Sequence, residues 1–159
     1  MNIYIMRHGD APFQTDQDGH GERRLSALGS SDVADMARLL KEHLSQSQQA
    51  IDAVMVSPLT RAQETADIVV RVLAEQFIGE LSTDDCLLPE ANPEFSALYI
   101  EALAHKNILL VTHMPFVANL FNYWVPEQRQ YFATSSIAAI SIEPQVTDKP
   151  LLKAFFQPK

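Results

Sequence analysis

The sequence predicts an α/β protein with an open, mostly parallel central sheet and helices on both faces. Short strands that are apolar at nearly every position are typical of parallel sheets covered on both sides. Segments with helical apolar spacing alternate with these strands along the chain, which favours an open α/β sheet. Charged and titratable residues stand directly after three of the strands, and such sheets bind their ligands at the carboxyl ends of the strands.

The first half of the chain contains two predicted strand–helix pairs. Residues 3–6 (IYIM) and 53–56 (AVMV) have the pattern of buried strands. Residues 27–44 carry apolar side chains at the i, i+3, i+4, i+7 spacing of one buried helix face, and residues 59–77 form a second helix with the same kind of face.

The second half continues the alternation and ends in strands. Asn92 can cap a third helix that has Pro93 at its first position, and we expect its buried face to consist of Phe95, Leu98, Tyr99 and Ala102. Residues 108–111 form a strand and residues 116–124 a fourth helix. Residues 137–142 and 151–156 are two strands, expected as a hairpin-like pair at one edge of the sheet.

Length and composition limit the classes of function. The 159 residues suit one domain, residues 1–159, and the formal net charge of -8 disfavours nucleic acid and anionic membranes as partners. No apolar stretch reaches the ~18 residues of a membrane span, and no signal peptide is visible. We therefore expect a soluble, cytoplasmic protein.

The single cysteine, Cys86, excludes a disulfide within the chain and a cysteine-rich metal site. A catalytic thiol requires a basic neighbourhood, whereas Cys86 follows Asp84 and Asp85. We therefore expect Cys86 to be structural.

The three strand ends bring together residues of one chemistry. Arg7 and His8 follow the first strand, Ser57 follows the second with Arg61 in the helix behind it, and His113 follows the strand at 108–111. Pro58 and Pro115 each suit the first position of a helix, so two helix N-termini are expected at the same edge. Guanidinium groups, imidazoles and helix N-termini together favour a doubly charged anion such as phosphate.

His8 is the best candidate nucleophile in this set. A neutral imidazole has a free lone pair near neutral pH, and Gly9 is expected to leave room beside it for a phosphorus atom. His113 can donate a hydrogen bond to a phosphate oxygen as charge develops. Taken singly, each residue has a plainer interpretation: a polar strand end for His8, a surface charge for Arg7, and a helix cap for His113.

A metal site is the other interpretation of two histidines near carboxylates. It is disfavoured because Arg7 and Arg61 would lie beside the cation and repel it. The sequence therefore predicts neither a metal nor another cofactor.

The segments MRHGDA, VSPLTRAQET and VTHMP, in this order, resemble the histidine phosphatase superfamily, which has the phosphoglycerate-mutase-like fold. The resemblance covers essentially the whole chain. Within the superfamily the chain is most similar to the SixA-type phosphohistidine phosphatases, because of its small size without a large cap subdomain, the RHGDA form of the first motif, and FATSSIAAI at residues 132–140.

The resemblance implies roles for individual residues. His8 would accept the phosphate, and Arg7, Arg61 and His113 would complete the phosphate pocket. Ser57 and Gly9 would belong to the substrate-binding set. Arg23 would also belong to it, since it matches an arginine that this branch places near the pocket, although Arg24 stands where a proline is usual. The implied mechanism forms a phosphohistidine at His8, which water then hydrolyses.

Glu90 stands in the segment where larger members of the superfamily place a carboxylic general acid. It is a candidate for that role, or it pairs with an arginine, or it begins the helix at Asn92. Imidazole released from phosphohistidine is a better leaving group than an alkoxide, so a SixA-type enzyme depends less on such an acid.

The resemblance also implies a substrate. The expected partner is a phosphohistidine-bearing phosphotransfer domain or a phosphocarrier protein, since an open pocket without a large cap can admit a side chain from a protein surface. The alternatives are a phosphomonoesterase for a small metabolite and a non-catalytic module that binds phosphorylated proteins. The sequence also predicts a mobile loop at residues 12–24, directly after the RHG segment.

Overall fold

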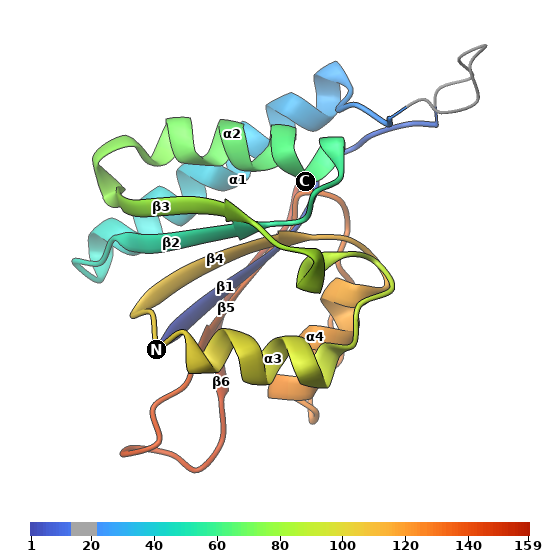
Figure 1. The fold of residues 1–159 in the computed structure, drawn as a ribbon. Coiled ribbons are helices and arrows are strands. Elements are labelled where there is room, and N and C mark those ends of the chain that lie inside the picture. The colour runs from blue at the N-terminus through green and yellow to red at the C-terminus, as the bar shows by residue number, and fades with distance from the viewer. Residues whose placement is uncertain (14–21) are drawn as a thin grey trace.

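The computed structural model describes residues 1–13 and 22–159, and within them the chain forms one six-stranded sheet (Figure 1). The strand order is β3-β2-β4-β1-β5-β6. The strands are β1 (Asn2–Arg7), β2 (Ile51–Val56), β3 (Phe77–Thr83), β4 (Asn107–Thr112), β5 (Ile137–Ser141) and β6 (Leu151–Phe156). The predicted loop at residues 12–24 falls largely on residues outside the described ranges.

The sheet is mostly parallel, as predicted. Strands β3, β2, β4 and β1 run in the same direction, whereas β5 is antiparallel to β1 and β6 is antiparallel to β5. The expected hairpin-like pair at one edge is therefore confirmed. The carboxyl ends of β1, β2 and β4 meet at one edge of the sheet, and the amino end of β5 lies at the same edge.

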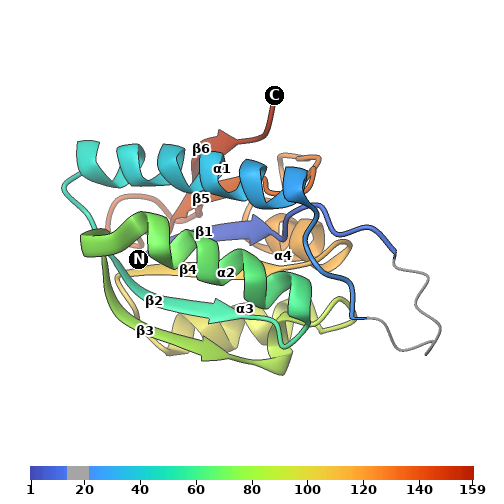
Figure 2. The ribbon, with the colours of Figure 1, turned by 90° about the horizontal axis from the view of Figure 1, so that it is seen from above.

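Two helices cover each face of the sheet, which confirms the predicted architecture (Figures 1 and 2). The helices α1 (Ala27–Gln46) and α2 (Thr60–Leu73) pack together on one face, and α3 (Pro93–Ala102) and α4 (Phe116–Trp124) pack together on the other. Short 3-10 turns precede β3 and α3, η1 at Ala74–Gln76 and η2 at Asp85–Leu87.

The buried strands divide their side chains between two apolar clusters. In β1, Tyr4 and Met6 pack with α1 and α2, while Ile3 and Ile5 pack with α3 and α4. All four side chains are almost completely buried. This explains the unbroken apolar run in the sequence, because successive strand residues point to opposite faces and both faces are covered.

The predicted helix at residues 59–77 is too long, and β3 was missed. The helix ends at Leu73, where Ala74 takes a positive φ of 49° and reverses the chain. The chain then enters β3, which pairs with β2 at the edge of the sheet and is mostly exposed. An exposed edge strand lacks the continuous apolar pattern that identified the buried strands.

The third helix begins as predicted, but its buried face differs from the prediction. Asn92 caps the helix, accepting a hydrogen bond of 2.9 Å from the Phe95 amide, and Pro93 is its first residue. The buried residues are Ser96, Ala97 and Ile100. The residues that the sequence predicted to be buried point outward instead: Phe95, Leu98, Tyr99 and Ala102.

Two helix starts are also corrected. Helix α2 begins at Thr60, two residues after Pro58, and Pro115 is the N-cap of α4 rather than its first residue. Both helices still begin at the edge where the parallel strands end. Arg61 is the second residue of α2, which places it in the first turn, as expected.

Across residues 1–13 and 22–159, no helix combines the length and the apolar character needed to cross a membrane. The cytoplasmic location stays a prediction.

Candidate active site

The strand ends bring the predicted residues into one cluster. β1 and β4 pair in register, with Arg7 opposite Thr112, so His8 and His113 follow neighbouring strands. Their rings lie side by side with centroids 5.0 Å apart. Ser57 follows β2, on the other side of β4, and its amide donates to the carbonyl of Val111. Three segments far apart in the sequence thus meet at one edge.

The contacts of the His8 ring define which nitrogen is nucleophilic. Nδ1 lies 2.7 Å from the carbonyl oxygen of Gly9. Because a carbonyl can only accept, Nδ1 carries the proton and Nε2 keeps its lone pair. Nε2 accepts a hydrogen bond of 3.2 Å from Nε of Arg61, which agrees with this tautomer. The lone pair of this ring that is available to attack a phosphorus atom is therefore that of Nε2.

Both imidazoles are held neutral. The pKa of His8 is lowered to about 4, mainly by burial. The hydrogen bond to Gly9 opposes this shift, and the positive charges of Arg61, Arg7 and Arg23 add to it. Burial likewise lowers the pKa of His113 to about 3, with His8 and the same arginines contributing. At neutral pH, His8 therefore has a lone pair available without first losing a proton.

His113 is fixed by Ser57. The Ser57 hydroxyl lies 2.6 Å from Nε2 of His113, and both residues are buried. Nδ1 of His113 is also buried and has no hydrogen-bond partner among the described residues. A buried polar atom without a partner is costly, so this nitrogen is suited to a polar ligand such as a phosphate oxygen.

Three guanidinium groups lie around the imidazoles, and none of them forms an ion pair with a carboxylate of the described residues. Arg7 donates from Nη1 to the carbonyl of Phe132 at 2.8 Å, and its Nε has no partner among the residues described. Burial lowers the pKa of Arg7 and of Arg61, and the charge of Arg23 adds to this effect at both. No ion pair within residues 1–13 and 22–159 involves any of the three. A doubly charged anion would relieve this repulsion.

The carboxylates of Asp10 and Glu64 hold the chain that precedes α1. Asp10 accepts a hydrogen bond of 2.6 Å from the Ser26 hydroxyl, and Glu64 accepts one of 2.8 Å from the Leu25 amide. Their charges therefore serve to position this segment. It carries Arg23, whose Nε donates to the carbonyl of Ala11 at 2.7 Å. The structure thus brings Arg23 close enough to act electrostatically on the cluster.

Gly9 has a different role from the one predicted. A Cβ atom there would lie 2.7 Å from Cγ2 of Val33 and 3.1 Å from the Gly29 carbonyl oxygen. Helix α1 fills the space that was expected to accommodate phosphorus. The glycine is therefore required by the close approach of β1 to α1, which fixes the position of the neighbouring His8.

Thr65 joins the His8 loop to Arg61, a role that was not predicted from the sequence. Its hydroxyl accepts a hydrogen bond of 3.1 Å from the Gly9 amide and donates one of 2.7 Å to the Arg61 carbonyl. Its position in SPLTRAQET could have indicated this contact, because Thr65 lies one helical turn after Arg61.

Residues 132–136 complete the edge of the site and were also missed. The Ser135 amide donates to the carbonyls of Arg7 and His8, at 3.2 and 3.1 Å, and the Ser136 carbonyl accepts from the Arg7 amide. Ser135 has a positive φ of 68°, and the buried hydroxyls of both serines have no partner in the described chain. The sequence had used FATSSIAAI only as a mark of resemblance. Beside this segment, the exposed Tyr131 interacts with Arg7.

Glu90 and Cys86 make no hydrogen bond or ion pair with His8 or His113 in the described structure. Glu90 is exposed in the turn before α3, and no hydrogen bond or ion pair joins it to another described residue. Cys86 is partly buried, and burial together with a hydrogen bond to Asp84 raises the pKa of its thiol to about 12. A thiol with this pKa stays protonated, in agreement with the predicted structural role.

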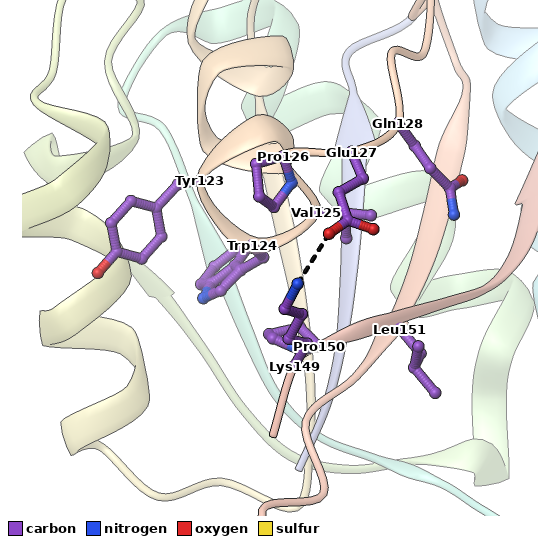
Figure 3. Close-up of a pocket in the computed structure, with 9 residues that line it drawn as sticks. All are labelled: Tyr123, Trp124, Val125, Pro126, Glu127, Gln128, Lys149, Pro150 and Leu151. Atoms are coloured by element: carbon purple, nitrogen blue, oxygen red, sulfur yellow. Dashed lines mark hydrogen bonds and ion pairs between the residues drawn. The ribbon is translucent and has the colours of Figure 1, made fainter. Parts of the chain in front are cut away.

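One groove lies away from the cluster of His8 and His113. A groove of about 260 Å³ is formed by residues at the far end of α4 and the start of β6, including Trp124, Lys149 and Leu151 (Figure 3). Lys149 and Glu127 form an ion pair of 2.8 Å across it. None of the histidines or arginines described above lines this groove. Within the described ranges, no group of three or more His, Cys, Asp and Glu side chains is placed to hold a metal ion.

Comparisons with known proteins show the family to which this chain belongs. Residues 3–87 match the model of the histidine phosphatase superfamily (branch 1). The chain is 30% identical to phosphohistidine phosphatase SixA of Escherichia coli over 90% of its own length and 86% of that protein. It is 32% identical to a SixA homologue of Haemophilus influenzae, over 76% and 74% of the two chains.

A solved structure has the same fold over nearly the whole length. The structure of the protein histidine phosphatase SixA complexed with tungstate superposes with a TM-score of 0.81 and 25% identity, covering 98% of this chain and 96% of that one. The chain belongs to the histidine phosphatase superfamily. The resemblance inferred from the three motifs is thereby confirmed, as is the SixA-like fold.

Proposed function

We propose that this protein is a phosphohistidine phosphatase that uses His8 as a covalent nucleophile. The observation that carries this proposal is the joint placement of two neutral imidazoles among three guanidiniums that no carboxylate of the described chain neutralises. Such a site attracts a phosphoryl group and offers it a nucleophile. The names of the SixA relatives and the tungstate complex, an oxyanion complex, support the same activity.

In the first step Nε2 of His8 forms a bond to phosphorus while the bond from phosphorus to the leaving nitrogen breaks. The hydrogen bond from Nδ1 to Gly9 stabilises the positive charge that the His8 ring gains. Arg7 and Arg61 neutralise the phosphoryl oxygens, and His113 donates to one of them. Arg61 leaves Nε2 for a phosphoryl oxygen as phosphorus approaches.

In the second step a water oxygen attacks phosphorus and the bond from Nε2 to phosphorus breaks. Inorganic phosphate is released, and the electron pair returns to Nε2. The low pKa of His8 favours this step, because an imidazole that is a poor base is a good leaving group.

Phosphohistidine is the substrate that fits this site best. Its imidazole leaving group needs little help from a carboxylic acid, and Glu90, the candidate acid, is exposed and has no contact with His8 or His113 in the described structure. A small phosphomonoester would require protonation of an alkoxide. The partner is accordingly a protein that carries phosphohistidine, such as a phosphotransfer domain or a phosphocarrier protein.

The test compares phosphate release from a phosphohistidine-bearing phosphotransfer domain with release from a panel of sugar and nucleotide phosphates. We expect much faster turnover of the phosphoprotein and full activity of Glu90→Gln. Faster turnover of a small ester, with loss of activity in Glu90→Gln, would instead assign the enzyme to phosphomonoester metabolism. Tight binding of the phosphoprotein without turnover would indicate a non-catalytic binding module.

A further inference from the structure

Helix α3 presents an apolar face to solvent. Phe95 is 66% exposed, Leu98 is 55% exposed and Tyr99 is 38% exposed, and the rings of Phe95 and Tyr99 stack with an interplanar angle of 14°. The opposite face of the same helix packs against the sheet through Ala97 and Ile100. A helix that is apolar on both sides normally has a partner on both sides.

This face adjoins the active site. Phe95 and Tyr99 line a hollow of about 480 Å³ together with Asp84, Asp85 and Cys86. The amide of Asp84 donates to the carbonyl of Val56, the residue before Ser57.

A second hydrogen bond attaches the same segment to the other side of the site. The hydroxyl of Thr112, the residue before His113, donates to the carbonyl of Leu87 at 2.5 Å. Two hydrogen bonds thus attach residues 84–87, three of which line the hollow, to Val56 and Thr112, the residues that precede Ser57 and His113.

The surroundings of the face are acidic. Asp84 and Asp85 form one end of the hollow, and Glu90 and Glu94 stand in the turn and first helical turn that lead into it. The charge of Asp84 also raises the pKa of the Tyr99 phenol. No lysine or arginine occurs between residues 72 and 105. An apolar centre with an acidic rim is complementary to an apolar surface with lysine or arginine at its edge.

We propose that the outward face of α3, formed by Phe95, Leu98 and Tyr99 with Asp84 and Asp85, is the docking surface for the protein that carries the phosphohistidine. A histidine side chain is short, so a protein that inserts one into the pocket must lay its own surface against the rim. The proposal rests on the proposed function and adds the chemistry of the partner: an apolar patch beside the phosphorylated histidine, bordered by basic residues.

Steady-state kinetics on two substrates test this assignment. The first is a phosphotransfer domain phosphorylated on histidine, and the second is phosphoimidazole, which reaches the same pocket without touching α3. We expect Phe95→Ala/Leu98→Ala to raise KM for the phosphoprotein by about tenfold or more, as for truncation of interface anchors. The kcat/KM for phosphoimidazole should stay within about twofold of the wild-type value. Both side chains are largely exposed, so the variant is expected to fold.

The matched control is Leu28→Ala, which removes a leucine that is 64% exposed on α1. It should leave KM for both substrates unchanged. Asp85→Asn should raise KM for the phosphoprotein at low salt and lose this effect at high salt, because exposed charges act through a screened field.

Three results would overturn the docking assignment. An active enzyme whose KM for the phosphoprotein is the same in Phe95→Ala/Leu98→Ala and in Leu28→Ala would refute it alone, leaving the proposed function intact. A wild-type enzyme that turns over phosphoimidazole but not the phosphoprotein would refute the docking assignment and the proposed substrate together. A changed oligomeric state in sedimentation, with an unchanged KM, would show that the face joins two copies of this chain.

Discussion

Nε of Arg61 donates a hydrogen bond of 3.2 Å to Nε2 of His8, the atom that we propose attacks phosphorus. In this proposal Arg61 holds the nucleophile in the resting site and neutralises the phosphoryl group during the reaction. Its backbone is tied to the His8 loop through Thr65, whose hydroxyl contacts both the Arg61 carbonyl and the Gly9 amide. The position of the nucleophile and the position of the charge are thus set together.

The charge of Arg61 contributes to the low pKa of His8. In Arg61→Gln the cation is removed, so protonation of His8 becomes less costly and the pKa of His8 should rise from about 4 toward its usual value of 6.5. Because burial is the largest cause of the shift, the rise should be partial. NMR titration of the His8 ring measures it, and Arg38→Gln, which removes an exposed arginine of α1, is the control. An unchanged pKa of His8 would contradict this account.

Ser57 should act through His113. Removing its hydroxyl in Ser57→Ala frees the His113 ring, and we expect kcat to fall by about tenfold, corresponding to the ~1.4 kcal/mol of one hydrogen bond. A positioning residue has no further effect once the residue it positions is absent. The double variant Ser57→Ala/His113→Ala should therefore match His113→Ala in kcat. Additive losses would mean that Ser57 contacts the substrate independently.

Gly9 should be intolerant of a side chain because of α1. In Gly9→Ala the new methyl group would meet Cγ2 of Val33 at 2.7 Å, and such overpacking costs about 1–3 kcal/mol of the free energy of unfolding. Urea unfolding measures this loss. In a Val33→Ala background the contact is absent, so the same substitution should cost less. An equal cost in both backgrounds would exclude Val33 as the cause.

Stability should decrease in mild acid because of the buried histidines. His8 and His113 have pKa values of about 4 and about 3 in the folded protein, below the usual 6.5, and burial also lowers the pKa of His43. Below pH 6.5 the unfolded chain takes up protons that the folded protein does not, so the free energy of unfolding falls as the pH decreases from 6.5 toward 4. Urea unfolding at intervals across this range should show this slope.

The variant His113→Gln removes one of these titrating groups. Its free energy of unfolding should therefore fall less steeply between pH 6.5 and 4 than that of the wild type. A slope identical to the wild-type slope would show that His113 does not contribute.

The sequence predicted the sheet, its helices and the central cluster because these depend on local patterns. Strands buried on both faces appear in the sequence as continuous apolar runs. Ligands bind at the carboxyl ends of such strands, so the residues that follow them, such as His8 and His113, indicate the site. Gly9 follows His8 as the sequence shows, but the reason predicted for a glycine there was wrong. The approach of Val33 is a contact between distant segments, which no local pattern contains.

The errors in the fold have related causes. The exposed edge strand β3 has no apolar run, and the turn at Ala74 uses a positive φ at a residue that favours helices. The face of α3 was assigned from its largest apolar side chains, Phe95 and Leu98, whereas packing against the sheet selected Ala97 and Ile100. A helix that is apolar all round gives no periodic signal by which to choose between its faces.

The most direct test of the central claim is a rapid-quench experiment with a phosphotransfer domain carrying radiolabelled phosphohistidine. Label should appear transiently on this protein, on Nε2 of His8, before inorganic phosphate is released, and phosphorus NMR of the trapped species identifies the nitrogen. His8→Ala should neither take up label nor release phosphate. Phosphate release by His8→Ala at the wild-type rate, or label on another residue, would contradict the account.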